Sequence, residues 1–333
     1  MKNIFTILAL TIGFSMNAQP FWFQGAGSGA IQTNYATASG YASTAIGRGT
    51  TASGDFSTAM GGTASGRAST AMGGSTTASG DYSTAMGFDT QASGNVSTAM
   101  GLFTEASGSY STAMGNGSEA SGFISTAMGS STTGSGNVST AMGAGTTAIG
   151  DYSTAMGRST TASDFGSLVI GQYNSSGSSV TSDATSFNIA NTAFVIGNGT
   201  YSSNTSDAFK VMFNGDATLS NDLTVEGDIV ISSDARLKAN IVSLGSTLAR
   251  LLLIDGKSYT MKKDGKQKIG VLAQDIQKVF PELVSTDDRD MLAVNYQGLV
   301  PVLINALKEQ DGKMKEQEKR LERLEAIISN MDK

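Results

Sequence analysis

Ser233 and Lys238, five residues apart, are the residue types in this chain that best fit an attack on a peptide bond. A serine hydroxyl attacks a carbonyl only when a base removes its proton, and a lysine whose pKa is lowered by burial can be that base. The chain has no histidine and no cysteine, which excludes Ser-His-Asp triads, thiol nucleophiles and zinc sites built from those residues. We expect no metal and no cofactor.

The pair lies in the sequence Ser-Asp-Ala-Arg-Leu-Lys. Lys238 can fold back onto Ser233 across one turn. The pattern alone is weak, because Ser-Asp before a helical stretch is a common N-cap and Arg236 and Lys238 would ordinarily be surface charges. We expect Asp234 to position the loop or cap a helix rather than to transfer a proton, and the residues alone give no chemical role to Arg236.

Upstream of this pair the chain is repetitive. Nine copies of Ser-Thr-Ala-Met/Ile-Gly lie in residues 43–157, almost all 14 residues apart, with Thr-x-Ala-Ser-Gly between them. A fixed short period predicts a stack of coils, each with two short strands and two glycine corners. Alternation places Thr84 and Met86 on one face and Ser83 and Ala85 on the other. We expect the methionine column to pack inside each coil or against neighbouring chains, because one coil encloses only a thin core.

The motif A-S-G-x-x-S-T-A-M-G and its period resemble the head repeats of trimeric autotransporter adhesins over about residues 34–171. The resemblance implies a mainly β fold with a trimeric left-handed parallel β-roll, or solenoid, as head. Thr and Met often stand where those adhesins have Val and Ile. A flat Thr/Ser face could instead bind ice or a polysaccharide. Calcium-binding repeats are disfavoured, since we find no aspartate at a fixed place in the unit.

The N-terminus has the order of a secretory signal peptide over residues 1–18: a lysine, a short apolar run, then small and polar residues. We expect cleavage after Ala18 and a secreted or cell-surface protein, with an N-terminal anchor as the alternative. We expect no membrane span in the mature chain. The absence of a run of like charge argues against nucleic acid as a partner.

Composition divides the rest of the chain. Residues 24–171 form the sparsely charged repeat head, and a degenerate copy at 167–171 reads as its terminal cap. Residues 172–232 lose the period and read as a β-rich neck. We expect strands over three apolar alternations there, at residues 193–196, 208–213 and 223–231.

Heptad order from Leu299 to Lys333 predicts a coiled-coil helix with parallel neighbours. One seam position holds Val300, Leu307, Met314, Leu321 and Ile328, and the other holds Leu303, Gln310, Gln317, Leu324 and Met331. Such a helix can hold several chains level, and repetitive rods need that alignment because they can pair out of register.

Residues 232 to about 325 resemble the intramolecular chaperone auto-processing domain at the C-terminus of phage endosialidase tailspikes. The ordered motifs are SDARLK, then GVLAQD, VFPELV and VNY. The resemblance implies a small α+β domain, assigned to residues 233–298 before the helix, that helps a β-rich trimer fold. It also implies release by self-cleavage, with Ser233 as nucleophile, Lys238 as base, and Asp234 and Asn240 in supporting positions.

The sequence therefore predicts a secreted homotrimeric fibre whose C-terminal chaperone aligns three chains and cuts itself once beside Ser233. It would be a single-turnover serine peptidase on its own chain alone. A cell-surface, glycan or matrix ligand is the partner expected for the head. The alternative is a structural or adhesive fibre whose C-terminal domain trimerises without cutting.

Overall fold

The structure is a computed structural model that describes residues 22–175, 184–287 and 290–331. The signal peptide predicted over residues 1–18 lies outside the described residues. The chain forms two compact units, divided between Thr224 and Val225.

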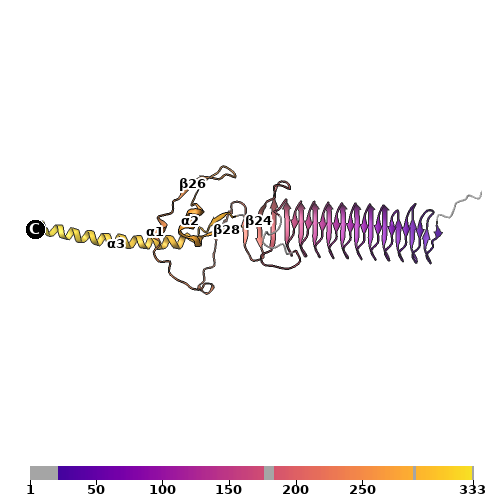
Figure 1. Cartoon of the computed structure of the whole chain (residues 1–333), viewed down its shortest axis with the longest axis horizontal. Coiled ribbons are helices and arrows are strands. Elements are labelled where there is room, and N and C mark those ends of the chain that lie inside the picture. The colour runs from indigo at the N-terminus through magenta and orange to yellow at the C-terminus, as the bar shows by residue number, and fades with distance from the viewer. Residues whose placement is uncertain (1–21, 176–183, 288–289, 332–333) are drawn as a thin grey trace, which may run out of the picture. The chain divides into compact units, whose positions relative to one another are not determined.

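Two sheets with alternating strands build the described part of the first unit (Figure 1). The larger sheet, in spatial order, contains β1 (Phe23–Gln24), β2 (Ile31–Gln32), β4 (Thr44–Ile46), β6 (Thr58–Met60), β8 (Thr70–Gly74), β10 (Thr84–Phe88), β12 (Thr98–Leu102), β14 (Thr112–Asn116), β16 (Thr126–Ser130), β18 (Thr140–Ala144), β20 (Thr154–Arg158), β22 (Leu168–Gln172), β23 (Thr192–Asn198), β24 (Asp207–Met212) and β25 (Ala217–Leu219). The smaller sheet contains β3 (Thr37–Ala38), β5 (Thr51–Ala52), β7 (Thr63–Ala64), β9 (Thr77–Ala78), β11 (Gln91–Ala92), β13 (Glu105–Ala106), β15 (Glu119–Ala120), β17 (Thr133–Gly134), β19 (Thr147–Ala148) and β21 (Thr161–Ala162).

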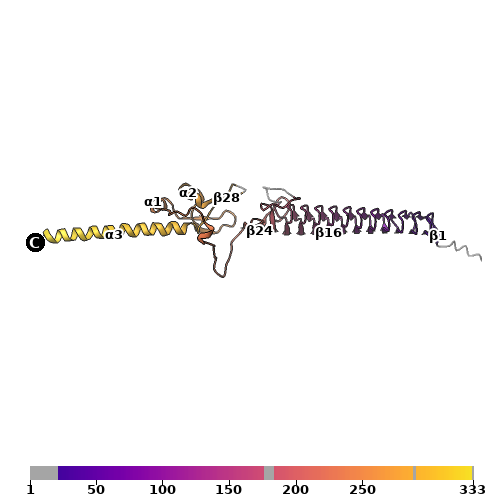
Figure 2. The ribbon, with the colours of Figure 1, turned by 90° about the horizontal axis from the view of Figure 1, so that it is seen from below.

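Each coil of the repeat adds one strand to each sheet, so the predicted two-strand coil is confirmed (Figure 2). The parallel strands pair in register, so that Met86 lies beside Met72 and Met100. The single 12-residue interval keeps this register, since Thr58 pairs with Thr70 and Thr63 pairs with Thr77. The two missing residues therefore fall in the corner between the long and the short strand.

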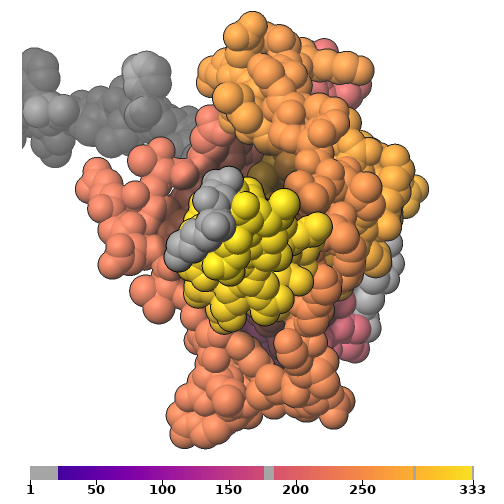
Figure 3. Space-filling view, turned by 90° about the vertical axis from the view of Figure 1, so that its left-hand side faces the viewer, coloured from indigo at the N-terminus to yellow at the C-terminus, as the bar shows by residue number. Residues whose placement is uncertain are grey.

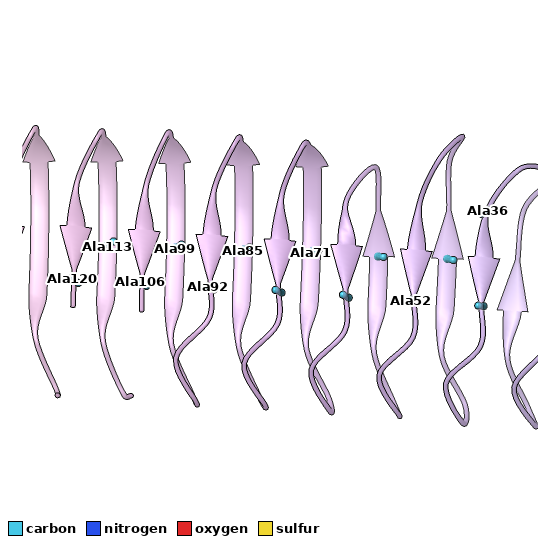
Figure 4. Close-up of a cluster of buried hydrophobic side chains, with 14 of the residues drawn as sticks. Ala36, Ala52, Ala71, Ala85, Ala92, Ala99, Ala106, Ala113 and Ala120 are labelled. Atoms are coloured by element: carbon cyan, nitrogen blue, oxygen red, sulfur yellow. The ribbon is translucent and has the colours of Figure 1, made fainter. Parts of the chain in front are cut away.

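Alanines, together with buried serines and threonines such as Ser83 and Thr90, form the core of each coil (Figure 4). Ala85, Ala92 and Ala99 are completely buried, as are the equivalent alanines along the stack. The small alanine side chains let the two sheets lie close together. Glycine at the corner lets successive coils stack closely, because a Cβ on Gly94 would lie 2.0 Å from the carbonyl oxygen of Gly108 in the next coil. The thin core expected from the sequence is confirmed.

The methionine column lies on the outside of the coils. Met100 is 37% exposed, and Met86 is half-buried on the same outward face as Thr84. The expectation that these side chains pack inside each coil is therefore wrong, because alanine fills that space. Packing against neighbouring chains is the option that remains.

One corner of each coil places a side chain on left-handed backbone. Tyr82, Tyr110 and Tyr152 have φ near 60°, a conformation that costs free energy for residues other than glycine. The N–H groups of these residues donate to carbonyls of the preceding coil over 2.7–2.8 Å. Stacking therefore offsets the local strain and leaves an exposed column of aromatic and aliphatic side chains.

An aspartate or asparagine precedes the corner residue in several coils, as Asp81 precedes Tyr82 and Asp151 precedes Tyr152, which corrects the expectation that no aspartate recurs at a fixed place. Asp55 and Asp81 accept hydrogen bonds from the backbone N–H groups of Tyr41 and Arg67, each over 2.8 Å. These carboxylates cap backbone groups of the preceding coil. Their role in the structure is to tie coils together.

The stack of the larger sheet continues past the degenerate copy at 167–171, so that copy is not its terminal cap. β23 pairs in parallel with β22, and the antiparallel strands β24 and β25 follow. The smaller sheet ends at β21, where the side-chain amide of Asn174 replaces the next strand. It accepts from the Thr161 N–H over 2.8 Å and donates to the Thr161 carbonyl over 3.0 Å.

Strands were expected at residues 193–196, 208–213 and 223–231, and the structure has the first two. Residues 223–231 form no strand, so that expectation is wrong. Ile229, Val230 and Ile231 are 57–89% exposed. Their apolar alternation has no opposing face on which to pack among the residues that the structure describes.

The second unit has α+β character. Its helices are α1 (Leu248–Leu251), α2 (Ala273–Val279) and α3 (Leu299–Met331), with short 3₁₀ turns η1 (Ala235–Leu237) and η2 (Pro281–Leu283). Its strands form two antiparallel hairpins, β26 (Lys257–Thr260) with β27 (Gln267–Gly270) and β28 (Val284–Thr286) with β29 (Leu292–Val294).

A small core joins α2 to the start of α3. Ile276, Phe280 and Val302 are buried there, with partly buried apolar side chains around them. Arg250 covers Phe280, with its guanidinium carbon 4.0 Å from the ring centroid. This core fixes the first turns of α3.

The rest of α3 extends away from this core (Figures 1 and 2), and no described segment lies in front of its C-terminal end (yellow) in Figure 3. Leu307 is 72% exposed and Leu321 is 60% exposed. The predicted seam is therefore uncovered in the single chain. No helix among the described residues has the length and apolar character needed to cross a membrane.

Candidate self-cleavage site

A short turn brings Ser233 and Lys238 together. The turn is η1, and its N-cap is Asp234, whose carboxylate accepts from the Arg236 N–H over 2.8 Å. The Lys238 N–H closes the turn on the Ala235 carbonyl over 3.1 Å. The capping role expected for Asp234 follows from this geometry.

Lys238 Nζ donates a hydrogen bond to Ser233 Oγ over 2.7 Å. The contact is the one that a serine nucleophile and a lysine base need. Both side chains are exposed, and the lysine is the donor. To act as a base, this lysine must first lose a proton.

The Asp234 carboxylate forms an ion pair with Arg236. Arg236 Nη2 lies 2.8 Å from Asp234 Oδ2, and Nε lies 3.1 Å from Oδ1. These side-chain hydrogen bonds, followed by the Arg236 backbone N–H, hold the pKa of the Asp234 carboxyl below its ordinary value. The pairing also raises the pKa of the Arg236 guanidinium.

Asn240 takes left-handed backbone, with φ of 53°, and its side chain is exposed. Asparagine tolerates this conformation better than most residues. Its place in the structure is that of a turn two residues after Lys238, not of a group that touches the serine.

Apolar side chains flank the pair on both sides and face solvent. Val230 is 89% exposed, Leu237 is 72% exposed and Val242 is 82% exposed. Several exposed apolar side chains close to one site are typical of an interaction surface. In the single chain, nothing among the described residues shields the lysine from water.

Glu309 of α3 anchors the segment that follows the site. Its carboxylate accepts from the Ser246 hydroxyl over 2.6 Å, from the Thr247 N–H, and from the Leu248 N–H over 3.2 Å. These hydrogen bonds, from Ser246 first, lower the pKa of Glu309. Thr247 Oγ1 also donates to the Val302 carbonyl over 2.9 Å. The chain is thereby fixed on α3 nine residues after Lys238.

The sequence brought out Ser233 and Lys238 but missed two residues. Arg236 was left without a role, although its spacing from Asp234 could have indicated the ion pair. Glu309 was missed because its partners lie more than 60 residues away, and no local pattern marks such a contact. No cluster of three or more acidic side chains suited to a metal ion occurs in the described ranges.

The segment that begins at Ser233 matches a family model. That model is described as the chaperone of endosialidase, and it covers residues 233–285. Upstream, the YadA head domain repeat matches residues 38–63, 64–90, 92–118 and 148–174. Both resemblances are therefore confirmed, in the predicted order along the chain. The coils continue without a break between the last two head matches.

Long tail fibre proteins are among the relatives of the chain. Gp37 of Escherichia phage AR1 is 32% identical over 92 residues, which is 25% of this chain and 8% of that protein. Gp37 of Salmonella phage S16 is 28% identical over 117 residues, 32% of this chain and 16% of that protein. Gp37 of Enterobacteria phage M1 is 31% identical over 99 residues, which is 27% of this chain and 39% of that protein. The chain thus spans well under half the length of each.

Proposed function

We propose that this chain forms a homotrimeric, adhesin-like fibre outside the cell, whose C-terminal unit aligns three chains and then releases itself by cutting beside Ser233. The observation that carries the cutting step is the 2.7 Å contact between Lys238 and Ser233, at the first residue of the chaperone match. The tail fibre relatives and the adhesin-type head repeats support a fibre exposed outside the cell.

Exposed apolar columns support a trimer. The methionine column of the head and the leucine seam of α3 are both uncovered in the single chain. Burying one Leu or Met side chain contributes about 1.5–3 kcal/mol. Assembly around a shared axis would bury both columns and supply the core that single coils lack.

The chemistry favours the bond between Ser232 and Ser233. Ser233 Oγ can attack the preceding carbonyl through a five-membered ring, whereas attack on its own carbonyl needs a strained four-membered ring. Neutral Lys238 takes the hydroxyl proton as the O–C bond forms and returns it to the nitrogen as the C–N bond breaks. Water then hydrolyses the ester, which leaves a carboxylate on Ser232 and a free amine on Ser233.

The exposure of Lys238 explains why cutting would wait for assembly. Water stabilises the charged form of a lysine amine, and the charged form cannot accept a proton. In the trimer, covering the exposed apolar side chains of Val230, Leu237 and Val242 would exclude water from the site. The lysine amine would then lose its proton more easily, and its nitrogen lone pair would be free to accept the serine proton. Cutting then removes the alignment device only after the rods have paired, which makes the assembly hard to reverse.

The test is the intact mass of the full chain after purification, read under denaturing conditions. Wild type should give two fragments separated between Ser232 and Ser233, whereas Ser233→Ala and Lys238→Ala should stay whole. Ser232→Ala is the matched control and should still cut. A wild-type chain that remains whole as a trimer would leave the non-cleaving fibre as the function.

A further inference from the structure

Asp234 and Lys238 stand four residues apart, at opposite ends of the short turn η1, so the carboxylate is a near neighbour along the chain with which the lysine could pair. Another lysine of this chain shows what such an ion pair does to the pKa of the amine. In α3, Lys315 Nζ lies 2.7 Å from Asp311 Oδ2 at this spacing, and the hydrogen bond that Lys315 donates to Asp311 raises the pKa of Lys315. A lysine in such a pair is a poor base.

At the candidate site this pairing does not form. The Asp234 carboxylate is engaged by Arg236 through its Nη2, its Nε and its backbone N–H, over 2.8–3.2 Å. Lys238 Nζ points instead to Ser233 Oγ. Among the described residues, no carboxylate lies within 4.0 Å of Lys238 Nζ.

We propose that Arg236 is a positioning residue: it holds the Asp234 carboxylate away from the Lys238 ammonium and so leaves Lys238 for Ser233. The inference rests on the proposed function in taking Lys238 as the base. Asp234 and Arg236 are the charged side chains of the segment that carries Lys238. Since Lys238 is exposed, no element packs against it in the described chain.

Loss of the guanidinium has a defined consequence. Arg236→Gln keeps the backbone N–H that binds Asp234 but frees the side-chain oxygens, which can then pair with Lys238. A carboxylate paired with the Lys238 amine favours its charged form, so the pKa of this amine should rise in the variant. Each unit lowers the neutral fraction of the lysine tenfold at a pH below its pKa.

The first measurement does not depend on cutting. In the full chain carrying Ser233→Ala, which cannot form the ester, the pKa of the Lys238 amine is read by NMR titration of isotope-labelled lysine. Arg236→Gln should raise that pKa, and Asp234→Asn with Arg236→Gln should return it to the parent value. An unchanged pKa in Arg236→Gln, or a double variant that stays high, overturns the proposal.

The second measurement is the pH profile of cutting in chains that retain Ser233. Arg236→Gln should shift the profile to higher pH and slow cutting about threefold to tenfold near neutrality, and the double variant should restore it. Arg323→Gln on α3 is the control for loss of one positive charge. If the wild-type chain never cuts itself, the proposed function is wrong. The NMR titration of Lys238 still decides whether Arg236 is a positioning residue.

Discussion

At the scale of single residues, the glycine that ends each Ala-Ser-Gly corner sets how closely two coils can stack. The ideal Cβ of an alanine at position 94 would meet the backbone of the next coil at 2.0 Å. Backbone atoms cannot move aside as a flexible side chain can. The glycine column is therefore a steric requirement of the coil spacing.

Gly94→Ala should destabilise the head by at least about 1–3 kcal/mol, the usual cost of overpacking. Thermal unfolding followed by circular dichroism at the β-sheet band measures the effect. The neighbouring exposed Ser93→Ala is the matched control and should change the melting temperature little. Equal melting temperatures for the two variants would contradict the close approach of the coils.

The sequence was sufficient to pair Ser233 with Lys238, because five residues and one turn limit where the lysine can reach. The sequence was insufficient to assign a role to Arg236. Whether the Asp234 carboxylate pairs with Arg236 or with Lys238 depends on side-chain geometry. The aspartate ladder was missed for another reason. Asparagine replaces aspartate at that position in some coils, as at Asn137, and other residue types stand there in others, so the pattern is visible only when both are counted as acceptors.

At the scale of elements, the smaller sheet ends where a side chain imitates a strand. The Asn174 amide occupies the hydrogen-bonding place of the next peptide group and satisfies both polar groups of Thr161. An unpaired sheet edge invites further strand pairing. Asn174 thus terminates the smaller sheet and protects its edge.

Asn174→Ala should cost about 1–3 kcal/mol, because it leaves two backbone groups of a part-buried edge without their partner. Hydrogen exchange of the Thr161 amide is the direct readout, and exchange should become faster. Asn116→Ala, at an exposed position of β14, serves as the comparison. If Thr161 exchanges equally slowly in both variants, the amide does not cap the edge.

Glu309 links α3 to the segment after the cutting site, and this link depends on pH. Its folded-state pKa is depressed below the ordinary value of 4.5, so its contribution to stability is complete above that value. It is lost as the pH falls through the folded-state pKa. Unfolding of the C-terminal unit should therefore become easier as the pH falls below about 4.5.

Glu309→Gln should lose this part of the pH dependence, because a neutral amide does not titrate. Urea unfolding between pH 3 and pH 6 gives the comparison, with Glu322→Gln at an exposed site on α3 as control. The control should follow the wild-type curve. A Glu309→Gln curve parallel to wild type over this range would show that the carboxylate does not hold the segment.

The sequence predicted most elements, and its errors have physical causes. The period identified each coil of the head. It did not show that β23 continues the same sheet, because a long insertion separates the Val-Ile-Gly of β23 from that of β22. Residues 223–231 were expected to be a strand because they alternate. A strand also needs a neighbouring strand for its backbone hydrogen bonds, and the described part of the chain supplies none.

At the scale of the whole molecule, the proposed trimer depends on the uncovered seam of α3. Leu307→Gln should weaken assembly and slow cutting together, since a polar side chain at a seam position removes apolar burial. Sedimentation measures assembly, and denaturing mass measures cutting. Lys308→Gln, one residue outside the seam, should leave both unchanged.

Repetitive coils of nearly identical sequence can pair in several registers, so three chains require a fixed starting point. The α3 seam and the small core around Phe280 supply that point at the C-terminal end of the chain. Self-cutting would then separate the aligned rods from the unit that aligned them. Assembly before cutting is the central claim of this account.

Native mass spectrometry over the course of assembly tests that order most directly. The account predicts that full-length trimers appear first and that chains cut between Ser232 and Ser233 are found only in species that have passed through the trimer. Cut chains that accumulate from monomers, at concentrations too low for trimers to form, would contradict it.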